Sequence, residues 1–361
     1  MKTIIFCADG TWNGSGSEDD DDANPPITNV LKLFLALDGQ ETAADWHKVK
    51  EQELRLLDED GALLQTAKYI HGVGDSSNPL VKLLGGVFGV GLIARIVRGY
   101  TFISRSYEPG DQIVLVGFSR GAYTVRALGG MIASEGLLNP AMANDAGSEE
   151  AYRAYKAGSA VWQRYSETML KKSNEVDRLL GQFARVVDEL PVFMLRPPAA
   201  ADMVGVDKIA AIGVWDTVGS LGIPASYRHD QRVDSLRFVD TVLNQKVQHG
   251  FHAVAIDECR GDFAPTLWDS DERIKQVLFP GAHADVGGGY GWANNESGLS
   301  DVALNWMIGE LAQLGVRFSP SYRFDFKQDP DGYSHAPWRK FPFLGLAQSA
   351  RVFPSDLSVH A

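Results

Sequence analysis

The chain has 361 residues, 45% of them apolar, which is enough for two domains or for one α/β domain with insertions. Its formal net charge is −12 and it carries no basic tract, which argues against a nucleic-acid-binding protein. Its two cysteines, Cys7 and Cys259, lie far apart and match neither a disulfide framework nor a Cys-x-x-Cys metal motif.

The first predicted element is an apolar, β-branched strand at residues 3–8. It is too short for the core of a signal peptide and it meets Asp9, so we expect a cytoplasmic protein or one exported without a cleavable signal peptide. A glycine-containing loop follows, and such loops at the carboxyl end of a strand carry ligand contacts in α/β sheets. We interpret Gly10 and Thr11 as candidate donors of a backbone N–H to an oxyanion. A phosphatase loop of the haloacid dehalogenase type is disfavoured because Cys7 occupies the place of its nucleophilic aspartate.

Two stretches of unusual composition follow. Five consecutive acidic residues at 18–22 lack the alternating spacing of a calcium-binding loop, and we interpret them as a solvated loop. Residues 83–94 are uncharged but shorter than the ~18 apolar residues that a membrane span needs, so we expect them to line the core or a cleft. Transient contact with a membrane surface is the alternative. The other elements expected in this region are helices at 30–37 and 93–104 and a strand at 65–70.

The most informative stretch is a strand, a Gly-x-Ser-x-Gly pentapeptide and a helix in direct succession. A buried strand is expected at 113–116, the pentapeptide is Gly117-Phe118-Ser119-Arg120-Gly121, and a helix is expected at 122–132. This is the sequence context of a nucleophile elbow, with Ser119 as the nucleophile. The N–H of Arg120 would then help to hold an oxyanion. The alternative is an ordinary strand-to-helix turn capped by a serine.

The character of the chain changes at residues 139–207. Aromatic and aliphatic residues recur at helical spacing from 149 to 190, which predicts a helical insertion placed as a cap over the carboxyl edge of a sheet. The expected organisation is therefore a first part of the core at 1–138, the cap at 139–207, and a second part of the core with the tail at 208–361.

Beyond the insertion, two predicted strands end in polar residues. The strand expected at 208–215 leads into Asp216, and the strand expected at 274–279 leads into His283 and three glycines at 287–289. Helices are expected at 238–254, which holds His249 and His252, and at 299–314.

The alternation of strands and helices predicts an α/β-hydrolase-like fold, with a mostly parallel central sheet, helices on both faces and a helical cap insertion. Parallel strands end at one edge, so Ser119, Asp216 and His283 should meet there, in the chain order of α/β-hydrolases. His283 would take the proton of Ser119 and return it to the leaving group, while Asp216 fixes the imidazole tautomer. This mechanism needs no cofactor or metal ion, and its substrate would be a carboxylic ester or lipid.

Other interpretations stay open. Asp9, Asp216 and Asp285 follow predicted strands, and clustered carboxylates suit Mg²⁺ or Ca²⁺, so a metal-dependent phosphohydrolase is the alternative. Asp285 is otherwise a second candidate for the acid or a residue that supports it. A binding module without catalysis is a third interpretation.

A set of motifs extends over nearly the whole chain. It comprises Phe-Cys-Ala-Asp-Gly-Thr-Trp-Asn at 6–13, Thr-Asn-Val at 28–30, Gly-Val-Gly at 72–74, Gly-Phe-Ser-Arg-Gly-Ala-Tyr at 117–123, Val-Trp-Asp-Thr-Val-Gly at 214–219, His-Ala-Val-Ala-Ile-Asp-Glu at 252–258 and Pro-Gly-Ala-His-Ala-Asp-Val-Gly-Gly-Gly-Tyr at 280–290. Together these motifs resemble a widespread, largely uncharacterised α/β-hydrolase family that includes the first family of type VI secretion lipase effectors.

The resemblance implies a serine hydrolase fold and, for the effector members, phospholipase activity. Carried over by motif, it implies Ser119 as the nucleophile and Asp216 and His283 as the acid and the base. Two positions depart from the family pattern. The family has Asp where this chain has His71, and its C-terminal His-x-Ser-Val element is replaced by Asp-Leu-Ser-Val at 356–359, which leaves the contribution of the tail open.

Overall fold

The computed structural model describes most of the chain, namely residues 1–10, 27–41, 51–72, 88–172, 198–218, 241–291, 295–320, 327–340, 344 and 348–360. Thr11, the acidic run at 18–22 and residues 83–87 of the uncharged stretch lie outside the described residues.

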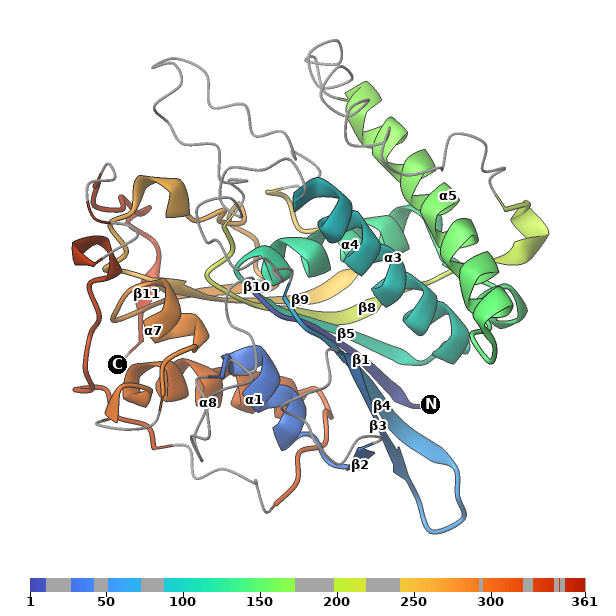
Figure 1. Ribbon diagram of the computed structural model, residues 1–361, viewed down its shortest axis with the longest axis horizontal. Coiled ribbons are helices and arrows are strands. Elements are labelled where there is room, and N and C mark those ends of the chain that lie inside the picture. Colours follow the sequence, from blue (N-terminus) through green and yellow to red (C-terminus); the bar gives the residue numbers. More distant parts are fainter. Residues whose placement is uncertain are drawn as a thin grey trace.

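The described strands form a nine-stranded sheet in the order β11-β10-β9-β8-β5-β1-β4-β3-β2 (Figure 1). The strands from β4 to β11 are parallel, and β3 and β2 add an antiparallel edge. In chain order they are β1 (Thr3–Ala8), β2 (Gln40–Glu41), β3 (Glu51–Leu57), β4 (Leu63–Ile70), β5 (Gln112–Phe118), β8 (Ile209–Trp215), β9 (Val247–Ala255), β10 (Ile274–Phe279) and β11 (Ser358–Val359), with β6 (Leu137–Leu138) and β7 (Met203–Val204) in a separate pair.

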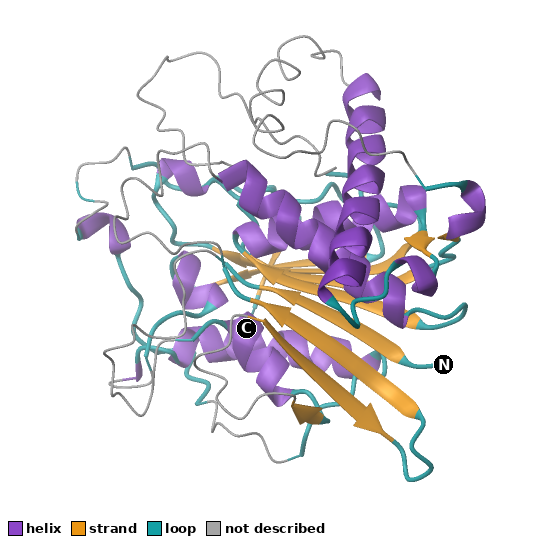
Figure 2. Cartoon of the chain, turned by 45° about the vertical axis from the view of Figure 1, so that its right-hand side comes forward, coloured by secondary structure: helices purple, strands orange, loops and turns teal. Residues whose placement is uncertain are grey.

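Helices cover both faces of the sheet (Figures 1 and 2). On one face lie α3 (Phe88–Ser106) and α4 (Arg120–Glu135), with α5 (Ser148–Lys172) packed outside them; on the other lie α1 (Asn29–Ala36), α7 (His283–Gly287) and α8 (Gly298–Gln313). Short 3₁₀ turns occur at Pro140–Met142, Ala200–Asp202, Gly261–Phe263 and Pro337–Arg339.

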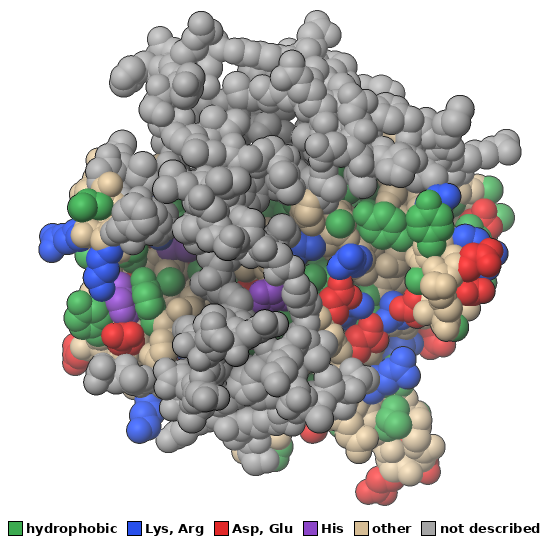
Figure 3. Space-filling model, in the orientation of Figure 1, with side chains coloured by type: hydrophobic (Ala, Val, Ile, Leu, Met, Phe, Trp, Pro, Cys, Tyr) green, Lys and Arg blue, Asp and Glu red, His purple; other side chains and the backbone are tan. Residues whose placement is uncertain are grey.

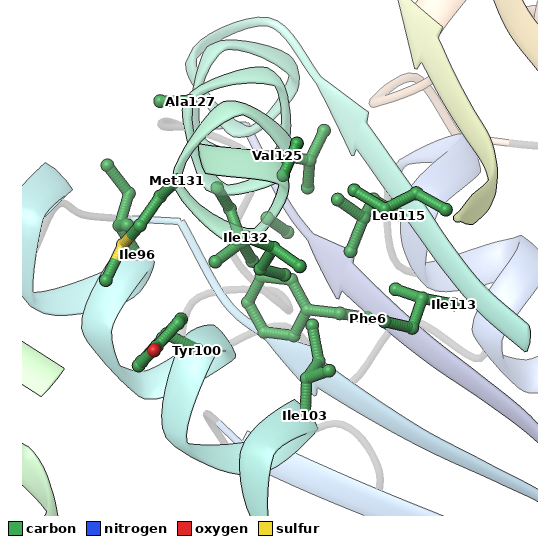
Figure 4. Packing of buried hydrophobic residues seen from close by; sticks show 14 of the residues in the cluster. Phe6, Ile96, Tyr100, Ile103, Ile113, Leu115, Val125, Ala127, Met131 and Ile132 are labelled. Atoms are coloured by element: carbon green, nitrogen blue, oxygen red, sulfur yellow. The ribbon is translucent and has the colours of Figure 1, made fainter. Parts of the chain in front are cut away.

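The central strands are buried on both sides, which explains their nearly continuous apolar sequences. In β1, Phe6 faces the α3–α4 layer and Cys7 faces the α1–α8 layer. Figure 4 shows Phe6 packed with residues of α3 and α4, such as Tyr100 and Ile132. The two hydrophobic layers fix the sheet between the helices, and the predicted α/β-hydrolase-like architecture is confirmed.

One predicted element is wrong. Residues 238–254 were expected to be helical, but their described part, from 241, forms turns and then strand β9, which carries His249 and His252. The segment reads Val-Gln-His-Gly-Phe-His-Ala-Val-Ala and lies between two other strands, where both faces are covered. A short apolar run of this kind does not distinguish a buried strand from a buried helix.

The long helix of the predicted cap, α5, packs along α3 and α4. Gly158 of α5 approaches Val97 and Tyr100 of α3, and Gly130 of α4 approaches the hydroxyl of Tyr165. Residues 173–197 of the insertion lie outside the described residues, and its covering of the site stays a prediction.

No helix among the described residues is both long and apolar enough to cross a bilayer. Acidic and basic side chains alternate on the right-hand side of the face shown in Figure 3.

Candidate active site

The turn from β5 into α4, where the sequence predicts a nucleophile elbow, is strained, and only small residues permit it. Ser119 has φ 56° and ψ −119°, in the positive-φ region that non-glycine residues seldom occupy. A Cβ on Gly117 would lie 2.5 Å from the carbonyl oxygen of Gly121, and one on Gly121 would lie 2.0 Å from that of Ala8. The two glycines therefore allow β5 to turn sharply into α4, which holds Ser119 above the sheet.

Ser119, His283 and Asp216 form a continuous hydrogen-bonded row. The hydroxyl Oγ of Ser119 lies 2.9 Å from Nε2 of His283, and Nδ1 of His283 lies 2.5 Å from Oδ2 of Asp216. All three side chains are buried, with residue exposures of 6%, 6% and 0%. The structure thus brings together the three residues that the sequence singled out, in the geometry of a nucleophile, a base and an orienting acid.

Asp216 follows β8 with a positive φ of 34° and is held on both carboxylate oxygens. Oδ1 accepts a hydrogen bond from the N–H of Ala255 at 3.0 Å, and Arg351 binds both oxygens at 2.7 and 2.9 Å. Burial by itself would raise the pKa of Asp216, but the charge of Arg351 and the hydrogen bond from His283 hold it far below its usual range. The carboxylate therefore stays ionised.

His283 begins the short helix α7 and lies between two aromatic rings. Its imidazole is 4.6 Å from the ring of Phe118 and 5.0 Å, edge-on, from that of Phe263. Gly287 is needed here, because a Cβ would lie 1.9 Å from the Phe118 ring. Burial lowers the pKa of His283, against the opposing effect of Asp216, so the imidazole is neutral near pH 7 and can accept a proton.

The loop after β1 reaches Ser119. A Cβ on Gly10 would lie 3.3 Å from the Cβ of Ser119, which places this backbone beside the site. The N–H of Gly10 donates to Oδ1 of Asp9 at 2.6 Å, and Oδ2 of Asp9 accepts from Tyr69 and Thr28 at 2.6 and 2.8 Å. Asp9 therefore anchors the loop, and burial raises its pKa to about 6. The oxyanion role of Gly10 stays a prediction that requires its N–H to leave Oδ1 of Asp9, and Thr11 lies outside the described residues.

Arg120 is the first residue of α4, where a backbone N–H has no acceptor within the helix. This N–H also lies at the positive end of the helix dipole, which favours its binding of an oxyanion. Burial, together with the charge of Arg95, lowers the pKa of the Arg120 side chain to about 9.

Asp285 does not contact the imidazole of His283. Its carboxylate accepts from Nδ1 of His335 at 2.6 Å and from the N–H groups of Ala282 and His335 at 2.8 and 2.9 Å. Asp285 thus ties α7 to the segment at 327–340.

Asp9, Asp216 and Asp285 are therefore engaged by three different sets of partners. This arrangement does not favour a shared metal ion, and the described residues contain no group of three His, Cys, Asp or Glu side chains placed to hold one. The phosphohydrolase interpretation gains no support from the geometry.

The other histidines have separate roles. His252 accepts from the N–H of Thr217 at 3.1 Å and meets Gln276 on its other nitrogen at 3.1 Å, and burial lowers its pKa to about 3. It supports the turn that carries Asp216. His71 lies 3.4 Å from the hydroxyl of Tyr69, next to the anchor of the β1 loop.

Two residues near the site were missed by sequence reasoning. Glu258, after β9, accepts the backbone N–H of His283 at 3.2 Å and is bound by Arg260 through Nε and Nη2 at 2.9 and 2.8 Å. It falls inside the motif at 252–258, which could have identified it. Arg351 falls in a tail without periodicity, and no sequence pattern marks it.

Comparison with known proteins gives the family. Residues 2–310 match the profile described as "T6SS, Phospholipase effector Tle1-like, catalytic domain". The chain belongs to this Tle1-like family. The uncharacterized protein YEL023C of Saccharomyces cerevisiae is 28% identical over 276 residues, which are 73% of this chain and 32% of the yeast protein.

Two solved structures are similar to this Tle1-like chain. One is an uncharacterized protein from Pseudomonas aeruginosa (18% identity, TM-score 0.44, covering 90% of this chain and 47% of that chain). The other is the Tle1 effector bound to the VgrG spike from the type 6 secretion system (17% identity, TM-score 0.37, covering 80% of this chain and 51% of that chain). The chain spans about a third of the yeast relative and about half of each solved chain.

Proposed function

We propose that this Tle1-like chain is a serine hydrolase that cleaves carboxylic ester bonds, with phospholipids as its substrate class. The observation that carries the proposal is the row Ser119–His283–Asp216, in which a neutral base lies within hydrogen-bonding distance of the hydroxyl and an ionised acid lies behind it. The name of the matched family supports the choice of phospholipid esters over other esters.

In the proposed reaction, Oγ of Ser119 attacks the ester carbonyl carbon while Nε2 of His283 takes the hydroxyl proton. The negative charge moves to the carbonyl oxygen, where the N–H of Arg120 and a donor from the loop at 10–11 would hold it, at on the order of 3 kcal/mol per donor. The tetrahedral intermediate then expels the alcohol, which receives the proton from His283. Water, deprotonated by His283, attacks the acyl-enzyme and releases the carboxylic acid and free Ser119.

The test compares the purified protein with Ser119→Ala on p-nitrophenyl esters and on phosphatidylcholine vesicles, with a fluorophosphonate probe in parallel. We expect Ser119→Ala to lower kcat by about 10⁴-fold or more and to abolish labelling. Ser134→Ala is the matched control, because Ser134 lies on the same helix, is exposed, and hydrogen-bonds only Glu135 in the described structure.

Other results would decide against the proposal. Activity that survives Ser119→Ala but disappears with a chelator supports the metal-dependent alternative. Hydrolysis of p-nitrophenyl esters without release of fatty acid from vesicles keeps the serine hydrolase and removes the phospholipid substrate. An absence of both hydrolysis and labelling supports a binding module.

A further inference from the structure

The C-terminal tail runs past the active site and is fixed on both sides of Arg351. On one side, the N–H of Ser349 donates to the carbonyl oxygen of Cys259 at 2.8 Å. On the other, β11 pairs with β10, and the N–H of His360 donates to the carbonyl oxygen of Leu278 at 2.9 Å. The backbone between these attachments holds Arg351 beside the end of β8. All of these tail residues follow residue 310, where the match to the Tle1-like profile ends.

The guanidinium of Arg351 is directed at the acid of the candidate triad. Nη1 lies 2.7 Å from Oδ1 of Asp216 and Nη2 lies 2.9 Å from Oδ2, a two-point contact that fixes the plane of the carboxylate. Nη1 also donates to the carbonyl oxygen of Ala255 at 2.6 Å, and Nη2 donates to that of Phe263. The side chain is only 4% exposed, so water competes little for these contacts.

We propose that Arg351 is a positioning residue of the active site, which holds the carboxylate of Asp216 in the orientation that serves His283. This inference rests on the proposed serine hydrolase function. Nδ1 of His283 donates to Oδ2 of Asp216, and Nη2 of Arg351 binds the same oxygen. The guanidinium therefore fixes the position of the oxygen atom that orients the imidazole. Arg351 itself touches neither the imidazole nor the hydroxyl of Ser119 in any contact that the structure gives.

Arg351 reaches the base by a second route. Its contact with the carbonyl oxygen of Phe263 holds the short 3₁₀ turn at 261–263, and the ring of Phe263 lies edge-on against the imidazole of His283. A second arginine, Arg260, lies over the same ring, with its guanidinium carbon 3.6 Å from the ring centroid. One tail residue therefore constrains both the acid and one wall of the pocket that holds the base.

The positive charge of Arg351 also has an electrostatic consequence. It offsets the negative charge of Asp216, which would otherwise stabilise the protonated imidazole more strongly. The other charged or titratable groups around His283 are Glu258 and Arg260 after β9, with the Asp285–His335 pair near its own helix. These groups are unchanged by a substitution at 351, so a shift in the titration of His283 would report on Arg351.

The test uses Arg351→Met and Arg351→Lys in the full chain. Arg351→Met removes both the two-point contact and the charge. We expect kcat to fall on the order of 100-fold with little change in KM, because the residue does not contact substrate. Without the charge of Arg351, Asp216 stabilises the protonated imidazole more strongly, so the pKa of His283 should rise. Activity requires neutral His283 and is lost as the pH falls through this pKa. The acid limb of the kcat/KM profile should therefore move to higher pH. Arg351→Lys keeps the positive charge but loses the two-point contact with the carboxylate. It should lower kcat while leaving the acid limb near that of the unchanged protein.

Arg339→Met is the matched control, since Arg339 is an exposed arginine of the same tail. We expect it to leave kcat and the pH profile unchanged. Equal losses of thermal stability in Arg351→Met and Arg351→Lys, with normal kcat and an unmoved acid limb, would overturn the proposal and leave Arg351 as a structural residue.

A second measurement separates this inference from the proposed function. The titration of His283 is followed by NMR, with its resonances assigned by comparison with His283→Ala. A higher pKa in Arg351→Met than in the unchanged protein supports the proposal even if no ester is hydrolysed, whereas the same pKa in both proteins contradicts it. Failure of the unchanged protein to hydrolyse esters or to react with fluorophosphonate would instead remove the serine hydrolase function.

Discussion

At the scale of single residues, Asp216 combines a strained backbone with a fully engaged side chain. Its φ of 34° is one that Asn and Asp tolerate better than most residues, so Asp216→Asn should preserve the turn. The amide would present its oxygen to two donors, the N–H of Ala255 and Nη1 of Arg351. Its NH₂ group would face Nδ1 of His283 and would lose the hydrogen bond from Nη2 of Arg351. Because Nδ1 must then accept, the imidazole carries its proton on Nε2 and cannot take one from Ser119.

We therefore expect Asp216→Asn to lower kcat by about 10⁴-fold. Stability should fall by up to about 3 kcal/mol, because the buried guanidinium of Arg351 loses its counter-charge. Steady-state kinetics and urea unfolding measure the two effects. The control is Asp269→Asn, an exposed carboxylate that accepts one hydrogen bond, from Thr241. Activity within a few-fold of the unchanged protein in Asp216→Asn would show that this carboxylate does not orient the base.

The sequence predicts the three central residues because each of them lies just beyond the carboxyl end of a strand of the parallel sheet, Ser119 and Asp216 directly after β5 and β8, and His283 in the turn after β10. That rule says nothing about contacts made from outside the strands. Arg351 lies 135 positions from Asp216, and His335 lies 50 positions from Asp285. Their positions depend on the path of the tail over the finished core, and neither residue lies in a periodic segment.

At the scale of elements, the packing of α4 against β1 depends on one missing side chain. Gly121 lies in the first turn of α4, and a Cβ there would lie 2.0 Å from the carbonyl oxygen of Ala8 and 2.6 Å from that of Asp9. Both are backbone atoms of the sheet and its loop, so neither can move aside cheaply. Gly121→Ala should therefore lower the free energy of unfolding by about 3 kcal/mol and displace Ser119.

Gly309 of α8 is the matched control for Gly121. It is also a helical glycine, but a Cβ there would meet no atom within 4 Å. Gly309→Ala should raise the free energy of unfolding by about 0.5–1 kcal/mol, since alanine loses less backbone freedom in a helix. Equilibrium unfolding in urea measures both variants, and equal stabilities for Gly121→Ala and the unchanged protein would contradict the close approach of α4 to β1.

The sequence predicts an element correctly where the composition of the segment fits only one kind of secondary structure. The run at 3–8 is β-branched and ends at a loop, and it forms β1 over the same residues. Strand β3, Glu51–Leu57, was not predicted, because its sequence Glu-Gln-Glu-Leu-Arg-Leu-Leu has the composition of a helix. Pairing with β4 decides its structure, and that information is not local.

At the scale of the whole molecule, the two predicted parts of the core share one sheet. Strand β5 from the first part pairs directly with β8 from the second, and the hydrophobic layers on both faces contain residues from both parts. The parts at 1–138 and 208–361 therefore build a common core, and contacts between them should determine global stability.

The clearest such contact is a buried ion pair between Lys32 of α1 and Asp301 of α8. Nζ lies 2.6 Å from Oδ1, and the two side chains are 0% and 1% exposed. Burial lowers the pKa of Lys32 and raises that of Asp301, so each charge depends on its partner. Lys32→Met should cost about 3–5 kcal/mol because it leaves the carboxylate buried without its counter-charge. The double variant Lys32→Met with Asp301→Leu should recover most of that loss, since neither charge remains to be desolvated. Urea unfolding of the single and double variants gives the coupling energy, and additive losses would show that the two side chains act independently.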